Sequence, residues 1–450
     1  MKTSIRIFSV VLLVCILASC FTACEIFGDD PTNAPGGSQL PEWVDYASQV
    51  KYNPNSNRVK QEVTLHQHID GDTTHFNLQT AVGGSKILKA RYLGVDTPES
   101  TGQIEKWGKK ASAYTKEKLT NATSIIVESD TDTWNPDSTG SRYMVWVWYK
   151  TAEMSDYSLL NLELLQLGLA KSKGTDNVYG SYCFDAFMQA RAYKLYVHSN
   201  DVDPDYYMGD AVVVDLKELA ANPAKYNGLK VVFEAVITRE FNNSIYLQAY
   251  SEETGMYHAI GAYYGYNFNG MDQLVLGNLM KIVGTVQYYE AGGTYQISDL
   301  KYSAFASDKS KYIEVLETGH EIVYQLTTPE QFCNGKVELY ITDDEGEEVL
   351  KEFSYAELAL NTAIEMKGLK VADIYTTNNP DSSSKGAMTL TCQADGYEIT
   401  VRTEVLYDAD GNLITEDYFE GKTIDVKGLV AYYNGNYQIK LISVNDVVVK

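Results

Sequence analysis

The interpretation of this chain depends on four stretches: DGDT (Asp70–Thr73), RYLGVDTPES (Arg91–Ser100), IEKWGKKASAYTKEKL (Ile104–Leu119) and DSTGSR (Asp137–Arg142). The first two stretches carry acidic residues beside turn-forming Gly and Pro, and the second and fourth each contain an arginine. Acids that can hold a hard cation, a carboxylate that can act as a base and two arginines therefore follow one another within one segment.

These residue types suit one kind of chemistry, the hydrolysis of a phosphodiester. A phosphodiester is anionic, so a nucleophile approaches it only where a cation held by carboxylates, together with arginines, neutralises its charge. Asp72 and Asp96 are the candidate carboxylate ligands. The DTPE turn adds the Thr97 carbonyl and the Glu99 carboxylate, with Pro98 fixing the backbone between them. Glu99 can then orient or deprotonate water.

Spacing alone leaves one point open. Arg91 lies five residues before Asp96 in an extended, apolar stretch. Residues an odd number apart in a strand point to opposite faces unless a bulge or bend intervenes, so alternation does not show that the two side chains converge.

In order and spacing, the four stretches resemble the staphylococcal (thermonuclease-like) nuclease family, and the resemblance extends over about residues 58–199. It includes NLELLQLGLAK at 161–171, which is similar to the second helix of the family. The resemblance implies a mostly β, α+β nuclease domain with an OB-fold five-stranded barrel and three helices, acting on DNA or RNA. It also implies roles for single residues: Asp72, Asp96 and Thr97 as ligands of Ca²⁺, Glu99 as the general base, Arg91 and Arg142 at the phosphate, and Asp70 beside the ligands.

The chain departs from the family pattern before its second arginine, and simpler interpretations exist for several residues. The family usually reads DxYGR where this chain has DSTGSR, so Arg142 is displaced by one residue. DGDT could be an ordinary hairpin turn, and Arg142 an ordinary surface arginine. Tyr179 and Tyr182 lie where the family stacks a base, but packing explains them equally well.

The N-terminus predicts export. Lys2 and Arg6 precede an apolar run at 7–17 that is too short to span a bilayer and has the layout of a signal peptide. The run ends in LASC, which resembles a bacterial lipobox with Cys20 as the lipidated residue; Cys24 is a second candidate, and a plain secretory signal is the alternative. We therefore expect an extracytoplasmic lipoprotein held at a membrane by its lipid, or else a secreted protein.

The rest of the chain contains a repeated module. The pairs ELAAN and ELALN, GLKV and GLKV, VGTVQYY and KGLVAYY, and GGTYQI and NGNYQI recur in one order, 139 to 144 residues apart. Each copy reads as a short helix followed by alternating strands, which resembles a small OB-type barrel. The predicted domains are a signal peptide (1–20), a flexible linker (21–57), the nuclease-like domain (58–200), repeat 1 (205–306), connecting strands (307–350) and repeat 2 (351–450).

Charge indicates what the repeats do not bind. The formal net charge is −23, and residues 201–450 account for −21 of it. OB barrels often bind single-stranded nucleic acid through a basic groove and aromatic side chains, but this charge opposes phosphate. We therefore expect the repeats to bind an unknown ligand other than nucleic acid.

Two classes of function remain at this point. One is a membrane-anchored, calcium-dependent nuclease that cuts DNA, RNA or both. The other is a surface binding or adhesion lipoprotein whose nuclease-like barrel is inactive. Because every acid and both arginines are present, the sequence favours the nuclease.

Overall fold

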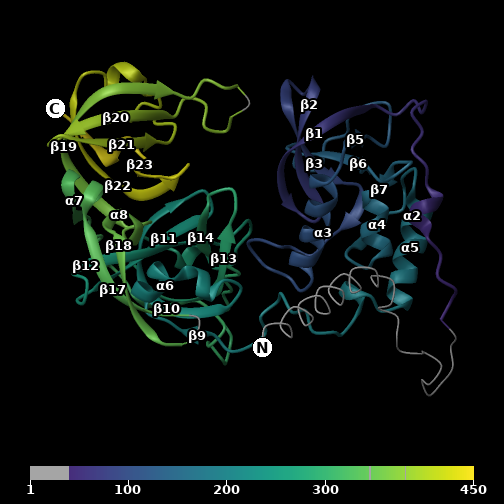
Figure 1. Ribbon diagram of the computed structural model, residues 1–450, viewed down its shortest axis with the longest axis horizontal. Helices are drawn as coiled ribbons and strands as arrows, with labels where there is room; N and C mark the ends of the chain where they lie inside the picture. Colours follow the sequence, from purple (N-terminus) through teal and green to yellow (C-terminus); the bar gives the residue numbers. More distant parts are fainter. Residues whose placement is uncertain (1–39, 344–345, 381) are drawn as a thin grey trace, which may run out of the picture. The chain divides into compact units, whose positions relative to one another are not determined.

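The computed structural model describes residues 40–343, 346–380 and 382–450. The expected signal peptide, with Cys20 and Cys24, lies outside these residues. Within them, no helix is both long enough and apolar enough to cross a membrane. The described chain is mostly β and contains three closed five-stranded barrels, one after another in sequence (Figure 1).

The first barrel is formed by strands in the order β3-β2-β1-β5-β6, and it closes because β3 also pairs with β6. That last pairing is parallel, whereas the others are antiparallel. This arrangement is that of an OB fold, as the sequence predicted. The barrel strands are β1 (Lys60–Asp70), β2 (Thr73–Val82), β3 (Ser85–Tyr92), β5 (Ser124–Glu128) and β6 (Tyr143–Lys150). The other elements are β4 (Gly94–Asp96), β7 (Ser158–Leu159), β8 (Lys171–Lys173), α2 (Tyr46–Gln49), α3 (Gly108–Thr120), α4 (Leu160–Gln166), α5 (Gly180–Ala192) and the 3₁₀ turn η2 (Tyr196–His198).

The segment before this barrel differs from its prediction as a flexible linker. Ala47, within α2, is buried and its N–H donates to Gln166 Oε1 at 2.9 Å. Val50 is also buried, and Tyr52 packs edge-on against Trp148 with ring centroids 5.5 Å apart. The linker prediction is therefore wrong for residues 47–52, because a few apolar side chains in a polar stretch join the core of the domain.

A buried ionic cluster supports the barrel wall. Glu128, fully buried at the end of β5, accepts from Arg58 Nε at 3.0 Å and lies 3.3 Å from Lys60 Nζ. Its carboxylate also accepts from Ser56 Oγ at 2.8 Å and from Trp148 Nε1 at 3.0 Å. A buried carboxylate with this many donors is stable. If the carboxylate or its cations were removed, the charge that remained would lack a counter-charge, which would lower the stability of the domain.

We expect Glu128→Ala to lower the free energy of unfolding of the first barrel by about 3–5 kcal/mol, because two partly buried cations lose their counter-charge. Glu62→Ala, on the exposed face of β1, should change it by less than about 0.5 kcal/mol. All five tryptophans lie between residues 43 and 148, so tryptophan fluorescence during urea denaturation reports on this barrel alone. Equal midpoints for the two variants would contradict the role of the cluster.

The second barrel has the strand order β13-β14-β12-β11-β10, closed by β13 with β10, and β12 runs parallel to β14. A short helix, α6 (Leu216–Ala221), precedes it. Its barrel strands are β10 (Lys230–Phe241), β11 (Ser244–Ser251), β12 (Met256–Tyr263), β13 (Leu279–Tyr289) and β14 (Thr294–Ser298), with β9 (Val212–Val213) and β15 (Glu314–Glu317) added at the edges and the 3₁₀ turns η3 (Pro223–Tyr226) and η4 (Met271–Gln273) in its loops.

The third barrel repeats this plan in the order β19-β20-β21-β23-β22, closed by β19 with β22, with β21 parallel to β23. Here α8 (Tyr355–Leu358) is the preceding helix. The barrel strands are β19 (Ala363–Thr376), β20 (Met388–Ala394), β21 (Tyr397–Thr403), β22 (Thr423–Tyr433) and β23 (Asn436–Leu441), with β16 (Gln325–Leu326) and β24 (Val447–Val449) at the edges and the 3₁₀ turns η5 (Glu416–Tyr418) and η6 (Val444–Asp446) in its loops.

Matching side chains confirm that the two barrels are copies. In the β13–β14 hairpin Tyr288 faces Tyr295, with ring centroids 5.0 Å apart and an angle of 56° between the rings. In the β22–β23 hairpin Tyr432 faces Tyr437 at 5.2 Å and 55°. The YY and YQI strands therefore face each other in both copies, as the sequence predicted.

Two equivalent glycines show the same constraint in each copy. A Cβ on Gly284 would lie 2.4 Å from Ile297 Cγ2, and one on Gly428 would lie 2.7 Å from Ile439 Cγ2. Both positions therefore require glycine, so that the isoleucine of the YQI strand can pack across the barrel.

The residues between the copies are divided between the two barrels. β15 pairs with β13 of the second barrel, whereas β16 pairs with β19 of the third. A separate hairpin of β17 (Lys336–Thr342) and β18 (Glu348–Ser354) follows the helix α7 (Pro329–Asn334).

Candidate active site

The DGDT stretch forms a tight turn between β1 and β2. Asp70 pairs with Thr73, so Gly71 and Asp72 form the turn itself. A Cβ on Gly71 would lie 2.7 Å from Thr97 Oγ1, and the Gly71 carbonyl accepts from Thr115 Oγ1 at 2.7 Å. Glycine is therefore needed because the turn packs directly onto the DTPE loop.

A bend in the backbone brings Arg91 to Asp96. β3 ends at Tyr92, and Gly94, with φ of +73°, begins β4, which pairs with β8 in a separate small sheet. Arg91 Nη2 consequently lies 2.8 Å from Asp96 Oδ1 and also 2.8 Å from Asp72 Oδ2. One guanidinium nitrogen thus joins the two predicted carboxylate ligands.

The third predicted ligand residue lies in the same place. Thr97 is buried, and its N–H donates to Asp72 Oδ2 at 3.0 Å. Lys173 Nζ, from β8, lies 3.1 Å from Asp96 Oδ1. The structure therefore brings Asp72, Asp96, Thr97 and Arg91 together, and adds a lysine that the sequence did not indicate.

The carboxylates are crowded. Burial raises the pKa of Asp72 to about 8, and the neighbouring Asp70 adds to the effect while Arg91 opposes it. Asp70 is itself buried, and its Oδ1 accepts from the Asp72 N–H at 3.2 Å. Burial and the neighbouring Asp70 thus disfavour the ionised form of Asp72 more than Arg91 favours it.

Glu99 lies in the loop after β4 and its side chain reaches solvent. Partial burial and then Asp70 raise the pKa of Glu99, and Arg91 lowers it, so the carboxylate is within electrostatic reach of the cluster. The Glu99 carbonyl accepts from Glu105 N at 2.9 Å, and the Glu99 N–H donates to Glu105 Oε2 at 3.1 Å. The loop therefore holds Glu99 by its backbone and leaves the carboxylate available.

Arg142 lies next to a strand that pairs with the strand of Arg91, but its own ion-pair partner is Asp137. It precedes β6, in which Met144 pairs with Arg91 of β3. Its Nε lies 2.8 Å from Asp137 Oδ2, and hydrogen bonds from Thr139 and Arg142 outweigh partial burial and lower the pKa of Asp137 to about 2. The structure thus places Arg142 just before β6, the strand beside β3, and pairs it with Asp137 rather than with Asp72 or Asp96.

Two side chains outside the motifs also shape the region. Asp203 Oδ2 accepts from the Trp107 N–H at 2.5 Å, immediately before α3. Tyr179 is buried, accepts from Arg58 at 2.8 Å and packs against Trp146 and Trp148. Tyr179 therefore has the packing role that the sequence left open, and no motif indicated Asp203.

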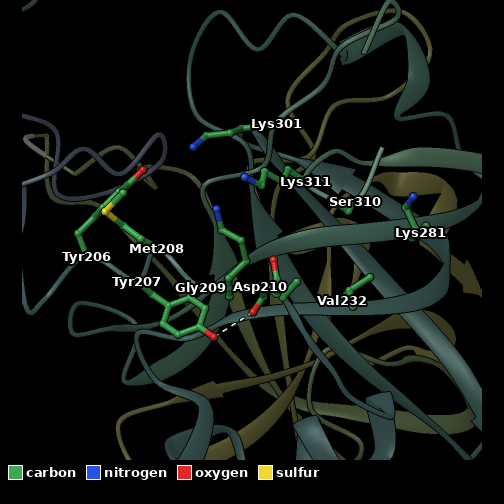
Figure 2. A pocket seen from close by; sticks show the side chains of 12 residues that line it. Tyr206, Tyr207, Met208, Gly209, Asp210, Val232, Lys281, Lys301, Ser310 and Lys311 are labelled. Atoms are coloured by element: carbon green, nitrogen blue, oxygen red, sulfur yellow. Dashed lines mark hydrogen bonds between the residues drawn. The ribbon is translucent and has the colours of Figure 1, made fainter. Parts of the chain in front are cut away.

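A hollow of about 380 Å³ on the second barrel is a different kind of feature (Figure 2). Three of its four lysines pair with acids: Lys230 and Lys301 lie 3.5 and 3.4 Å from the two carboxylate oxygens of Asp299, and Lys281 lies 2.7 Å from Glu314. These carboxylates offset most of the positive charge of the hollow.

Among the described residues no three His, Cys, Asp or Glu side chains gather so that they alone would hold a metal ion. Two carboxylates and a backbone carbonyl, by contrast, form a set of oxygen donors that a larger cation accepts when water completes the coordination. The fold and this cluster define an OB-barrel domain with an acid and arginine site.

Residues 89–195 match the family model described as staphylococcal nuclease homologue, so this part of the chain is similar to that family. The matched residues include Arg91, Asp96, Thr97, Glu99 and Arg142. Asp70 and Asp72 precede the matched range, so their place in the site rests on the ion pair and hydrogen bonds given above.

Proposed function

We propose that the chain is a calcium-dependent nuclease that hydrolyses phosphodiester bonds of DNA, RNA or both. The observation that carries the proposal is the single Arg91 nitrogen 2.8 Å from both Asp72 and Asp96. Three residues from two separate stretches of the sequence meet there, and an arginine beside two carboxylates suits phosphodiester chemistry. Cleavage of purified nucleic acids with and without calcium tests it.

The residues present fit a calcium ion. Asp72, Asp96 and the Thr97 carbonyl would hold it, and when bound it would supply positive charge beside the phosphate. The raised pKa of Asp72 supports this, because a cation beside that buried carboxyl would favour its ionised form.

The other roles follow from what each side chain can donate or accept. In the described structure the aspartates contact Nη2 of Arg91, so its Nε and Nη1 can donate to a phosphate. Arg142 would add a second guanidinium when it exchanges Asp137 for the substrate. The Glu99 carboxylate, which reaches solvent beside Arg91, would accept a proton from the attacking water.

The alternative of an inactive binding lipoprotein is less well supported. Loss of catalysis removes the reason to keep a buried arginine between two acids, because buried charges are costly to retain. Here Arg91, Asp72 and Glu99 are all present, and the first two are paired.

We expect cleavage to require calcium and to fail with magnesium alone, because two carboxylates and a carbonyl suit a larger ion of flexible coordination. Asp72→Ala and Asp96→Ala should each weaken calcium binding, measured by titration calorimetry, by at least about tenfold. Asp156→Ala, which removes a surface acid paired with Lys51, is the matched control and should bind calcium normally. Full activity in chelator would reject the metal assignment.

We also propose that the protein is exported and anchored by a lipid on Cys20, or else secreted. The support is the sequence: basic Lys2 and Arg6, the short apolar run and LASC. We expect labelling of the expressed protein with radioactive palmitate to disappear in Cys20→Ala and to persist in Cys24→Ala. The reverse result would move the lipid to Cys24, and no labelling of the parent would favour secretion.

A further inference from the structure

The loop that follows Glu99 is held by the second barrel. We call residues 100–103 the docking loop. Its Ser100 carbonyl accepts from Gln287 Nε2 of β13 at 2.9 Å, and its Gly102 carbonyl accepts from the Asp299 N–H at 2.5 Å. Gln103 Nε2 donates to the Leu300 carbonyl at 2.6 Å. Three hydrogen bonds thus fix the docking loop to β13 and to the residues that follow β14.

Tyrosines of the second barrel lie at this contact. Tyr263, the last residue of β12, has its Cε1 atom 3.2 Å from the place that a Cβ on Gly102 would take. After burial, the charges that raise the pKa of Tyr263 are those of Tyr266, Glu99 and Tyr289. Gly265 Cα lies 3.7 Å from the place that the Cβ on Gly102 would take, so Tyr263 and the residue before Tyr266 border the docking loop that follows Glu99.

Two of these rings are available to a ligand. Tyr266 is 79% exposed and Tyr289 is 45% exposed, although both lie beside a packed contact. Tyr289 ends β13 and begins the turn to β14, which corresponds to the loop between the fourth and fifth strands through which OB folds commonly bind oligonucleotides. Other exposed tyrosines, such as Tyr433, are explained as strand residues. Tyr266 and Tyr289 differ because each follows or precedes a residue that meets the first domain: Gly265 lies against Gly102, and Glu290 pairs with Lys116.

The charge at this place is less unfavourable than that of the whole repeat region. Glu290, next to Tyr289, pairs with Lys116 of α3 at 2.5 Å. Stacking requires the face of a base and no phosphate contact, so acidic surroundings oppose it less than they oppose a groove that follows the backbone.

We propose that Tyr266 and Tyr289 form a stacking subsite for unpaired bases, which extends the substrate site of the nuclease domain onto the second barrel. The inference rests on the proposed function and makes single-stranded nucleic acid the favoured substrate, because bases inside a duplex are already stacked. The charge of the repeats led us to expect that they bind no nucleic acid. The proposal changes this for the second barrel, which would supply two aromatic rings for stacking of bases beside the docking loop.

The test compares Tyr266→Ala/Tyr289→Ala with the parent, both without the first 24 residues. For a single-stranded oligonucleotide we expect KM to rise about tenfold or more, with kcat little changed. For bis(p-nitrophenyl) phosphate, which has no bases, kcat/KM should stay the same. Tyr266→Phe/Tyr289→Phe should restore the parent KM, because phenylalanine also stacks.

The duplicated barrel offers a matched control. Tyr433 occupies in the third barrel the position of Tyr289 in the second, since both end the YY strand, and it is 64% exposed. Tyr433→Ala should leave the KM for single strands unchanged.

A binding measurement keeps this inference separate from the proposed function. In a Glu99→Gln background, fluorescence anisotropy with labelled single-stranded DNA should show about tenfold weaker binding when both tyrosines are replaced by alanine. If the parent binds single strands but cuts nothing, the proposed function fails and this comparison still decides the subsite. Equal affinity with and without the two rings, or no binding by either protein, would overturn the inference.

Discussion

Replacing Glu99 by glutamine should lower the turnover of nucleic acid by about two to four orders of magnitude, the usual contribution of general base catalysis. The amide keeps the shape of the side chain but cannot take a proton from water. The loop should remain in place, because Glu99 contacts Glu105 and Gly108 through its backbone. Initial rates at saturating substrate and calcium measure the effect.

Glu117→Gln is the control for this prediction. Glu117 lies on α3 of the same domain, is exposed and has Lys118 at 4.0 Å as its neighbour. It should retain the parent rate. If Glu99→Gln were to cleave within about threefold of the parent while its tryptophan fluorescence was unchanged, Glu99 would not be the base.

The second large effect is expected for Arg91→Lys. An ammonium on a flexible stem cannot join Asp72 and Asp96 and still offer planar donors to a phosphate, so turnover should fall by about two to three orders of magnitude. Urea denaturation followed by tryptophan fluorescence must accompany the assay, because the substitution also alters a buried ion pair.

Arg191→Lys, a conservative change at an exposed position near the end of α5, should alter neither rate nor stability. A normal rate for Arg91→Lys would make Arg91 a structural residue that holds the aspartates. A rate loss matched by a large loss of stability would contradict a direct role at the phosphate.

The sequence predicted the barrels, but it left open how the candidate site residues are arranged in space. Period-two patterns and the repeated YY and YQI stretches were enough for the OB-like repeats, because these features depend on local alternation and short turns. Whether Arg91 meets Asp96 depended on the left-handed conformation of Gly94, and alternation carries no information about such a bend.

Contacts made by residues far apart in the sequence were not predictable from motifs. The contacts of Lys173 with Asp96 and of Asp203 with Trp107 are examples. Neither Lys173 nor Asp203 is part of a motif, and from the sequence alone a lysine or aspartate is expected at the surface. The docking of Ser100 on Gln287 depends on how two barrels pack, which neither barrel's own strands encode. Arg142 shows the reverse case, since a motif resemblance identified it while the structure pairs it with Asp137.

We propose that the cluster of Asp72, Asp96 and Arg91 cuts phosphodiester bonds. The most direct measurement incubates purified residues 25–450 with single- and double-stranded DNA and RNA, in calcium and in excess chelator, beside the Asp72→Ala variant. We predict cleavage of at least one substrate in calcium, none in chelator and none by Asp72→Ala. A folded, calcium-binding protein that leaves all four substrates intact would contradict the account.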